Sequence, residues 1–421
     1  MNEMMKDSGI AWIGKIPEHW KITKIKYSTE LRNEQEFYNK TSKFIALENV
    51  STYSGKYIET DSEYDEERYD VYKKGDLLFS KLRPYLAKAL IASDDGYCTG
   101  EFAIIKKFDG DIRYLFFYLL SDGCLSIINA STYGTKMPRA SWNYISNLCI
   151  PIINFTEQQA IAYFLDSACA KIDGIIADLE HQVDLLKEYK KSLITETVTK
   201  GLDKHVKLKD SGIAWIGKIP EHWEVTRLKY ISKFKTGGTP DDKSGINTEN
   251  DGFPWITAPD ITDSLDIRNY SQYITDKSVK LHRYSLFPAN SILLVCIASV
   301  GKIGMLHEYG YANQQITAIM SNNCILPRYL LFYLNSVATK ISADASSNVV
   351  PIINTRYLSN ISVILPSLEQ QQDIASFLDT RCAEVDSIIK GKEEQIEQQK
   401  EYKKSLIYEY VTGKKRVKEV E

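Results

Sequence analysis

The chain has 421 residues, of which 43% are hydrophobic and 25% are charged, and its formal net charge is −3. These values are typical of a globular protein with two or more domains, and they leave any polyanionic partner to local basic patches. No stretch reaches the roughly 18 apolar residues of a membrane span, and the N-terminus lacks the apolar core of a signal peptide. The seven cysteines form no C-x-x-C pair. Reduced thiols and a cytoplasmic location are therefore expected, with no metal site.

The chain opens with a phrase, KDSGIAWIGKIPEHW at residues 6–20, that recurs unchanged at residues 209–223. Its glycines and lysine have the spacing of a phosphate-binding loop, but Ile16 stands where that motif needs Ser or Thr to bind magnesium. Pro17 also favours an extended segment over the helix that follows such a loop. We therefore interpret the phrase as the start of a repeated domain. Its expected packing anchors are Trp12, Trp20, Trp215 and Trp223.

Further matches indicate that the chain is one unit written twice. YISN at residues 144–147 corresponds to YLSN at 357–360, and EYKKSLI at 188–194 returns at 401–407. The repeat distance of roughly 210 residues indicates a duplicated domain and excludes a solenoid of short repeats. Each copy begins with a mixed region of short apolar strands and one short helix, which is expected at residues 113–121 in the first copy.

Each copy ends in a long stretch without proline, at about residues 157–199 and 369–412. In the first stretch apolar residues recur every seven positions in two companion series, which is the pattern of a coiled-coil seam. The second stretch keeps apolar positions but turns polar in its middle. Because apolar seams must be buried, we expect the two helices to pack against each other in antiparallel orientation. The expected seam residues are Ile161, Leu165, Ile172, Ile175, Leu179, Leu186 and Leu193 in the first helix and Ile374, Leu378, Val385, Ile388 and Leu406 in the second.

The predicted fold class is α+β: two similar mixed α/β domains are separated by two long antiparallel helices that form a coiled coil, with a pseudo-two-fold internal repeat. The expected limits are residues 1–155 for the first domain, 156–200 for the first helix, 201–366 for the second domain and 367–421 for the second helix with its basic tail. A helix of about 43 residues is roughly 65 Å long. Two similar but non-identical heads at a fixed separation suit a repeating rod with two distinct sites, such as DNA.

Further sequence features accompany the repeated phrase: TGGTPDD at 236–242, FPWITAPDI at 253–261, SVGKIG at 299–304, NQQITAI at 313–319, and the proline followed by E-Q-Q that begins each long helix. With these features in this order, the chain resembles the specificity subunits of type I restriction–modification enzymes over its whole length. The resemblance implies that each head is a target-recognition domain that reads one half of a bipartite asymmetric DNA site. It also implies that the helices fix the spacing and dock methyltransferase subunits, with restriction subunits joining through the complex.

Candidate DNA contacts fall on polar turns of the two heads. Cations beside a Pro-turn in the first head suit phosphates or guanine, and an Asn-Gln-Gln triplet in the second suits adenine. The Gly-rich turn of the second head offers backbone N–H groups to a phosphate. The alternatives are solvated loops, a plain turn and amides that satisfy buried backbone groups. The candidates are Lys81, Arg83, Tyr85, Lys88, Lys136 and Arg139 in the first head and Thr236, Gly237, Gly238, Thr239, Lys302, Asn313, Gln314, Gln315 and Arg356 in the second.

No complete motif for methyl transfer, nucleotide binding or nuclease chemistry occurs in the sequence, so we expect no catalytic residue and no cofactor on this chain. The resemblance implies an adenine methyltransferase and restriction endonuclease complex in which S-adenosylmethionine, ATP and magnesium serve only the partner subunits. An alternative from another class is a two-headed coiled-coil scaffold that joins two protein clients without binding nucleic acid. The negative net charge mildly favours that alternative.

Overall fold

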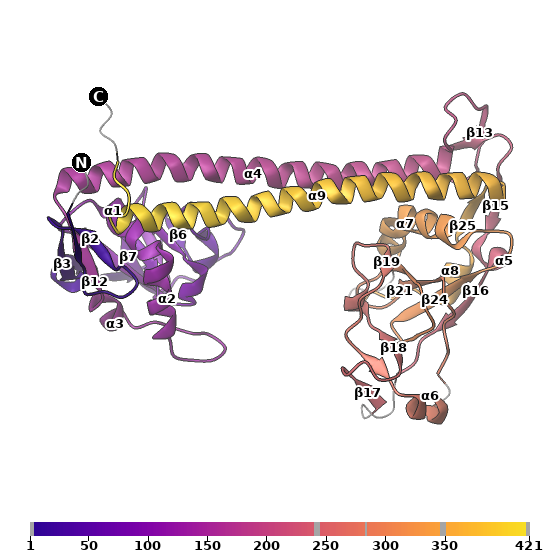
Figure 1. The fold of residues 1–421 in the computed structure, drawn as a ribbon, viewed down its shortest axis with the longest axis horizontal. Coiled ribbons are helices and arrows are strands. Elements are labelled where there is room, and N and C mark those ends of the chain that lie inside the picture. The colour runs from indigo at the N-terminus through magenta and orange to yellow at the C-terminus, as the bar shows by residue number, and fades with distance from the viewer. Residues whose placement is uncertain (1–3, 240–244, 283, 346–350, 418–421) are drawn as a thin grey trace. The chain divides into compact units, whose positions relative to one another are not determined.

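The computed structural model describes residues 4–239, 245–282, 284–345 and 351–417. The chain divides into two compact units, the first made of residues 1–182 and 392–421 and the second of residues 183–391 (Figure 1). Each unit contains sheets, short helices and a part of each of the two longest helices, α4 (Phe155–Lys200) and α9 (Leu368–Val411). The predicted α+β class with an internal repeat is thereby confirmed.

The first unit contains two four-stranded sheets, one fully antiparallel with the order β4-β11-β8-β9 and one with the order β5-β7-β10-β6. Their strands are β4 (Thr29–Leu31), β5 (Gln35–Phe37), β6 (Lys43–Ile45), β7 (Arg68–Tyr72), β8 (Leu77–Ser80), β9 (Ala89–Ile91), β10 (Gly96–Cys98) and β11 (Phe102–Phe108). Smaller pairs are β1 (Met5–Asp7) with β2 (Lys15–Pro17) and β3 (Lys21–Lys24) with β12 (Cys149–Ile152). The helices are α1 (Ile112–Leu120), α2 (Asp122–Ala130) and α3 (Trp142–Ser146).

The second unit repeats this plan with additions. Its larger sheet has the order β16-β24-β21-β22-β19, whose first four strands correspond to β4-β11-β8-β9. The strands are β16 (Ser232–Thr236), β17 (Ile246–Asn247), β18 (Phe253–Ile256), β19 (Asp266–Ile267), β20 (Tyr273–Ile274), β21 (Ser291–Val295), β22 (Ile303–Leu306), β23 (Tyr311–Ala312) and β24 (Ile316–Ser321). The pairs are β13 (Leu208–Asp210) with β14 (Lys218–Pro220) and β15 (Glu224–Arg227) with β25 (Ser362–Leu365). The helices are α5 (Leu228–Ile231), α6 (Asp276–His282), α7 (Pro327–Ala343) and α8 (Thr355–Ser359).

The start of each long helix is fixed to its unit by a buried amide. Gln158 accepts a hydrogen bond from the Asp111 backbone at the N-terminus of α1, at 2.9 Å, and Gln371 does the same for Leu326 before α7, at 2.8 Å. Trp20 donates to Glu157, and Trp223 donates to Gln370. Glu157 and Gln158 therefore correspond to Gln370 and Gln371, one position away from the match of the E-Q-Q letters. The contacts, not the letters, define this equivalence.

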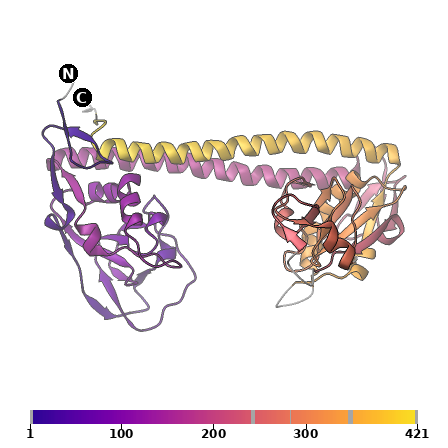
Figure 2. The ribbon, with the colours of Figure 1, turned by 60° about the horizontal axis from the view of Figure 1, so that its bottom comes forward.

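The two long helices run antiparallel within each unit (Figures 1 and 2). In the first unit the Lys403 ammonium lies 2.6 Å from the Asp173 carboxylate, and the rings of Phe164 and Tyr410 are 4.4 Å apart. In the second unit Lys190 pairs with Asp386 at 2.7 Å. Residue numbers rise along α4 as they fall along α9, which defines the antiparallel direction.

Most expected seam residues are buried or partly buried, but Ile175 and Ile388 are 46% and 50% exposed. Their neighbours Ile176 and Ile389 face the packed side instead. An isoleucine occupies both adjacent positions in each helix, and a seven-residue repeat does not choose between two adjacent positions. The start of each helix lies on its unit's core, and the drift of about 20° per heptad in a straight helix sets the phase from there.

The repeated phrase forms a hairpin in each unit, β1–β2 and β13–β14, whose tryptophans differ in burial. Trp20 and Trp223 are buried anchors as expected, whereas Trp215 is exposed and that expectation was wrong. In the first unit Tyr408 of α9 covers Trp12, with ring centroids 6.3 Å apart. The residue after the matching EYKKSLI segment of α4 is Thr195, which leaves a hollow beside Trp215.

Substitution of Gly123 should destabilise the first unit. A Cβ atom at Gly123 would lie 2.1 Å from the ring of Trp12, so Gly123→Ala is expected to cost about 1–3 kcal/mol as overpacking does elsewhere. Gly174 of α4 is the matched control because a Cβ there meets nothing within 4 Å, and alanine should stabilise that helix by about 0.5–1 kcal/mol. Urea unfolding measures both, and shifts of the same sign would contradict this packing.

Candidate nucleic-acid interface

The loop after β8 and the loop after β21 are each held by a backbone hydrogen bond from a residue with left-handed backbone angles to a proline carbonyl. We call this arrangement the clamp. Arg83 has left-handed backbone angles, with φ 47°, and its N–H donates to the carbonyl of Pro138 at 2.8 Å. Ala298 has φ 66° and donates to the carbonyl of Pro351 at 3.0 Å. Non-glycine residues rarely adopt this conformation, and when they do the surrounding structure holds them there. The two loops are therefore equivalent although their sequences do not match.

The same clamp aligns two further positions. The Lys81 carbonyl accepts from the Ala140 N–H at 2.8 Å, and the Cys296 carbonyl accepts from the Ile353 N–H at 2.9 Å. Adjacent bridges join Leu82 to Arg139 in the first unit and Ile297 to Ile352 in the second. The equivalent side chains are Lys81, Arg83 and Arg139 in the first unit and Cys296, Ala298 and Ile352 in the second. We call the first three the cationic cluster.

The members of the cationic cluster are held in different ways. Burial is the main cause that lowers the pKa of Lys81, which is half-buried. The Nε atom of Arg83 is buried and has no hydrogen-bond partner within the described part of the chain. Arg139 is exposed and pairs with Glu101 at 3.0 Å. Cations that are partly removed from water and incompletely paired favour an incoming anion, because it supplies the missing charge and acceptors.

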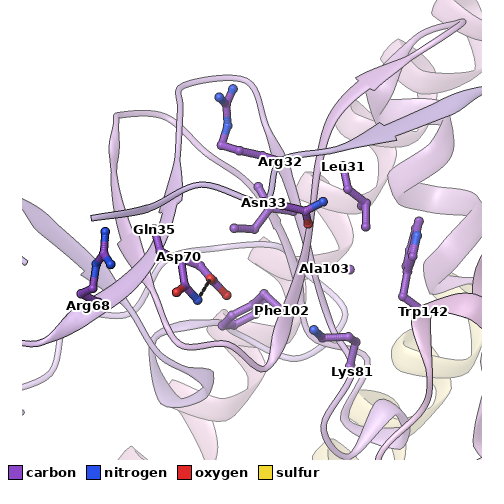
Figure 3. A pocket seen from close by; sticks show the side chains of 11 residues that line it. Leu31, Arg32, Asn33, Gln35, Arg68, Asp70, Lys81, Phe102, Ala103 and Trp142 are labelled. Carbon is purple, nitrogen blue, oxygen red and sulfur yellow. Dashed lines mark hydrogen bonds between the residues drawn. The ribbon is translucent and has the colours of Figure 1, made fainter. Parts of the chain in front are cut away.

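Lys81 also points toward a pocket of about 460 Å³ between the two sheets of the first unit (Figure 3). Some of the polar side chains that line the pocket already have partners within the protein: Gln35 donates to Asp70 at 2.7 Å, and Arg32 pairs with Asp76 at 2.7 Å. The lining residues are Leu31, Arg32, Asn33, Gln35, Arg68, Asp70, Lys81, Phe102, Ala103, Ile104 and Trp142. Sequence reasoning named only Lys81 among these, since the others come from separate strands and turns without a shared motif.

The remaining candidates of the first unit divide by exposure. Tyr85, in the turn after Arg83, and Lys136, in the loop before α3, are exposed. The ammonium of Lys88 donates to the Leu47 carbonyl at 2.8 Å, and burial lowers the pKa of this lysine. This geometry gives Lys88 an internal contact, because its charge is directed at the backbone and not outward as the sequence suggested.

The Gly-rich turn of the second unit does not offer its N–H groups to a ligand. Gly237 donates to the Ile316 carbonyl at 2.9 Å, and Gly238 donates to the Ala312 carbonyl at 3.0 Å. A Cβ at Gly237 would lie 2.2 Å from the Asn313 carbonyl oxygen. These glycines allow β16 to approach the segment after β23, so the expectation of a phosphate-binding turn at residues 237–238 was wrong. The flanking Thr236 and Thr239 are exposed.

The amide triplet lies beside that turn, so the structure brings the two candidate segments of the second unit together. Asn313 accepts a bond from the Gln315 backbone N–H at 3.1 Å, and its own amide donates to the Gln315 side chain at 3.0 Å. The alternative of amides that satisfy the backbone thus describes Asn313. Gln314 is exposed. Lys302 and Arg356 are also exposed, in the loop before β22 and in α8.

Two negative findings concern the part of the chain that the structure describes. No group of three or more His, Cys, Asp or Glu side chains is placed to hold a metal ion there. No helix there combines the length and the apolar character that a membrane crossing requires.

A family model described as the type I restriction modification DNA specificity domain matches residues 220–398. A Methanocaldococcus jannaschii protein provisionally named the type I restriction enzyme MjaX specificity subunit is 27% identical over 429 aligned residues, which cover 96% of each chain. The type I restriction enzyme EcoBI specificity subunit of Escherichia coli is 28% identical over 288 residues, which cover 65% of this chain and 60% of that protein.

Solved structures share the fold. A chain from a structure that describes complex assembly and conformational transition of the type I R-M system has a TM-score of 0.72 and 18% identity, and the match covers 94% of this chain and 98% of that chain. The HsdS subunit from Thermoanaerobacter tengcongensis has a TM-score of 0.50 with the same identity and coverage. At this identity the likeness supports the fold alone.

Proposed function

The chain belongs to the family of type I restriction–modification specificity subunits, and we propose that it is the DNA sequence-recognition subunit of such a complex. Each unit contains a target-recognition domain that reads one half of a bipartite asymmetric site on double-stranded DNA. The chain performs no catalysis, and the chemistry belongs to partner subunits.

The observation that carries this proposal is the clamp that the two units share. It holds side chains at three equivalent positions in each unit, and these are cationic in the first unit and uncharged in the second. Two domains that recognise different DNA sequences need the same backbone frame but different side chains on it. The frame positions the domain on DNA, and the contacts of its side chains to base edges give the sequence specificity. The two half-sites should therefore differ.

The proposed domain limits are residues 1–155 and 201–366, with α4 and α9 as the spacer. Both helices contribute to both units, so their length should fix the distance between the half-sites. Both helices also expose apolar side chains, and we assign these to contacts with methyltransferase subunits, since lasting subunit interfaces bury apolar surface. The exposed residues that support this are Tyr163, Ile175 and Tyr402 in the first unit and Leu185, Tyr189 and Ile388 in the second.

The partners in this proposal are an adenine methyltransferase and, through the assembled complex, a restriction subunit. S-adenosylmethionine, ATP and magnesium would be used on those chains. We place the complex in the cytoplasm, because its DNA target is found there and because cysteines stay reduced there.

Salt-dependent duplex binding separates this proposal from the protein-scaffold alternative. The affinity of the chain, assembled with its methyltransferase subunit, should fall steeply as salt rises, because each neutralised phosphate releases condensed counterions. The measurement is fluorescence anisotropy on a labelled duplex over a salt series. A scaffold for two proteins would bind duplex weakly at every salt concentration, and that result would remove the proposed function.

A further inference from the structure

Both units present a basic and aromatic surface at the same place in the repeat, and the candidate contacts described above do not include it. In the first unit it consists of Lys24 at the end of β3 followed by Lys26 and Tyr27, and in the second of Arg227 at the end of β15 followed by Lys229 and Tyr230. The Lys26 ammonium lies 5.2 Å from the centre of the Tyr27 ring, and the equivalent distance in the second unit is 5.1 Å. We call these surfaces the Lys–Tyr patches.

Both patches are held by the same backbone frame. Lys24 is paired with Cys149 across β3 and β12, and Arg227 is paired with Ser362 across β15 and β25. The next residue, Ile25, donates its N–H to the Leu148 carbonyl at 3.0 Å, and Leu228 donates to Ile361 at 2.9 Å. The side chains therefore leave the two units in the same arrangement, although the loops after β8 and β21 differ in charge.

The patches are exposed, and their cations have no ion pair within the described part of the chain. Tyr27 and Tyr230 are 70% and 67% exposed. Within the described residues no carboxylate forms an ion pair with a cation of either patch. In the second unit the contacts are to a neutral residue: Asn360 accepts from Arg227 at 2.6 Å and from Lys229 at 3.3 Å.

Each patch lies close to the clamp of its own unit. The clamp residue Ala140 precedes α3, and α3 packs against the turn that carries Tyr27. In the second unit α8 follows the clamp and packs against α5. Since α3 and α8 each have five residues, each is only roughly 7.5 Å long. A DNA strand that contacts the clamp loop can therefore extend to the patch.

We propose that each Lys–Tyr patch binds the sugar–phosphate backbone of DNA at its half-site, whatever the base sequence, an inference that rests on the proposed function. A surface that is the same in both units needs a ligand that is the same at both half-sites, and the backbone meets this condition while the bases do not. Lysine ammonium and tyrosine hydroxyl groups are usual donors to phosphate oxygens. Each patch holds two cations beside one tyrosine, and no ion-pairing carboxylate is found for them among the described residues, which favours a polyanion as the occupant.

The test compares Lys26→Gln/Tyr27→Ala, Lys229→Gln/Tyr230→Ala and the combination of all four changes in the chain assembled with its methyltransferase subunit. The probes are one duplex with the recognition site and one without it. Each pair of changes should lower the affinity for both duplexes by the same factor. The slope of log affinity against log salt should become shallower by about 0.9 for each phosphate that the variant no longer neutralises, and the combined variant should double the change.

The matched control is Lys74→Gln with Tyr309→Ala, an exposed lysine and tyrosine. Lys74 precedes β8 and Tyr309 follows β22, so each lies at the strand end away from the clamp loop, and the control should keep the wild-type slope. A patch variant with an unchanged slope would overturn the inference, including the case in which it loses the methyltransferase subunit. An effect on the specific duplex alone would assign base reading to the patch and also overturn it. If the wild type binds no duplex in a salt-dependent way, the proposed function itself fails.

Discussion

Lys403→Ala is expected to lower the free energy of unfolding by about 3–5 kcal/mol, because it leaves the largely buried carboxylate of Asp173 without an ion-pair partner. Lys403 and Asp173 join α9 to α4 in the first unit at 2.6 Å, with side chains only 6% and 17% exposed. Urea unfolding of the full chain measures the loss. The size of the effect comes from the buried charge left behind, and not from the net contribution of the ion pair.

Two comparisons isolate that cause. The double change Lys403→Met/Asp173→Leu removes both charges and should recover most of the stability, as apolar replacement of a buried pair does elsewhere. Lys190→Ala breaks the corresponding pair of the second unit, in which Asp386 is 53% exposed, and should cost about 0–1 kcal/mol. Equal losses for Lys403→Ala and Lys190→Ala would contradict the assignment of a buried pair between the helices.

Arg139→Ala is expected to lower DNA affinity by about 1–3 kcal/mol, a factor of about 5 to 150, if its guanidinium contacts a base or phosphate as the cationic cluster predicts. The loss should concern the first half-site only, since Ile352 occupies the equivalent position of the second unit. Binding is measured on duplexes with each half-site changed in turn. Lys74→Gln, at the far end of β8, is the control. Equal sensitivity of both half-sites would contradict the separate roles of the two units.

Lys81→Met, in the cationic cluster, should change the free energy of unfolding and the DNA affinity in opposite directions. Burial lowers the pKa of Lys81, so its charged form is less favourable in the folded state than in the unfolded state. Removing the charge should therefore raise the free energy of unfolding while DNA affinity falls. The gain should be present near neutral pH and disappear as pH rises through the ordinary titration range of lysine, where the wild-type side chain becomes neutral in both states.

Much of the architecture could be predicted because the chain repeats itself. The EYKKSLI segments and the long apolar series identified two copies and two long helices, and packing of the helices on each other followed from the need to bury both seams. The phase of the seam at Ile175 and Ile388 could not be predicted, because the adjacent Ile176 and Ile389 fit the heptad pattern equally well. Packing at the start of each helix decides between them.

The candidate site was harder to predict because the loops after β8 and β21 resemble each other in backbone conformation and not in sequence. Arg83 and Ala298 share no letter, yet both adopt a left-handed conformation and donate to a proline carbonyl. The N–H groups of Gly237 and Gly238 were misassigned because the sequence does not reveal that carbonyl groups of β24 and β23 accept from them. The Lys–Tyr patches were missed for another reason: a cation beside a tyrosine is common, and only the matched frames make this one distinctive.

Selection from a pool of random duplexes, with the chain assembled with its methyltransferase subunit, tests most directly whether two units read two different sequences. The recovered duplexes should contain two short, non-identical blocks separated by a gap of constant length and free sequence. Recovery of a single continuous block, of two identical blocks, or of no enriched sequence would contradict it.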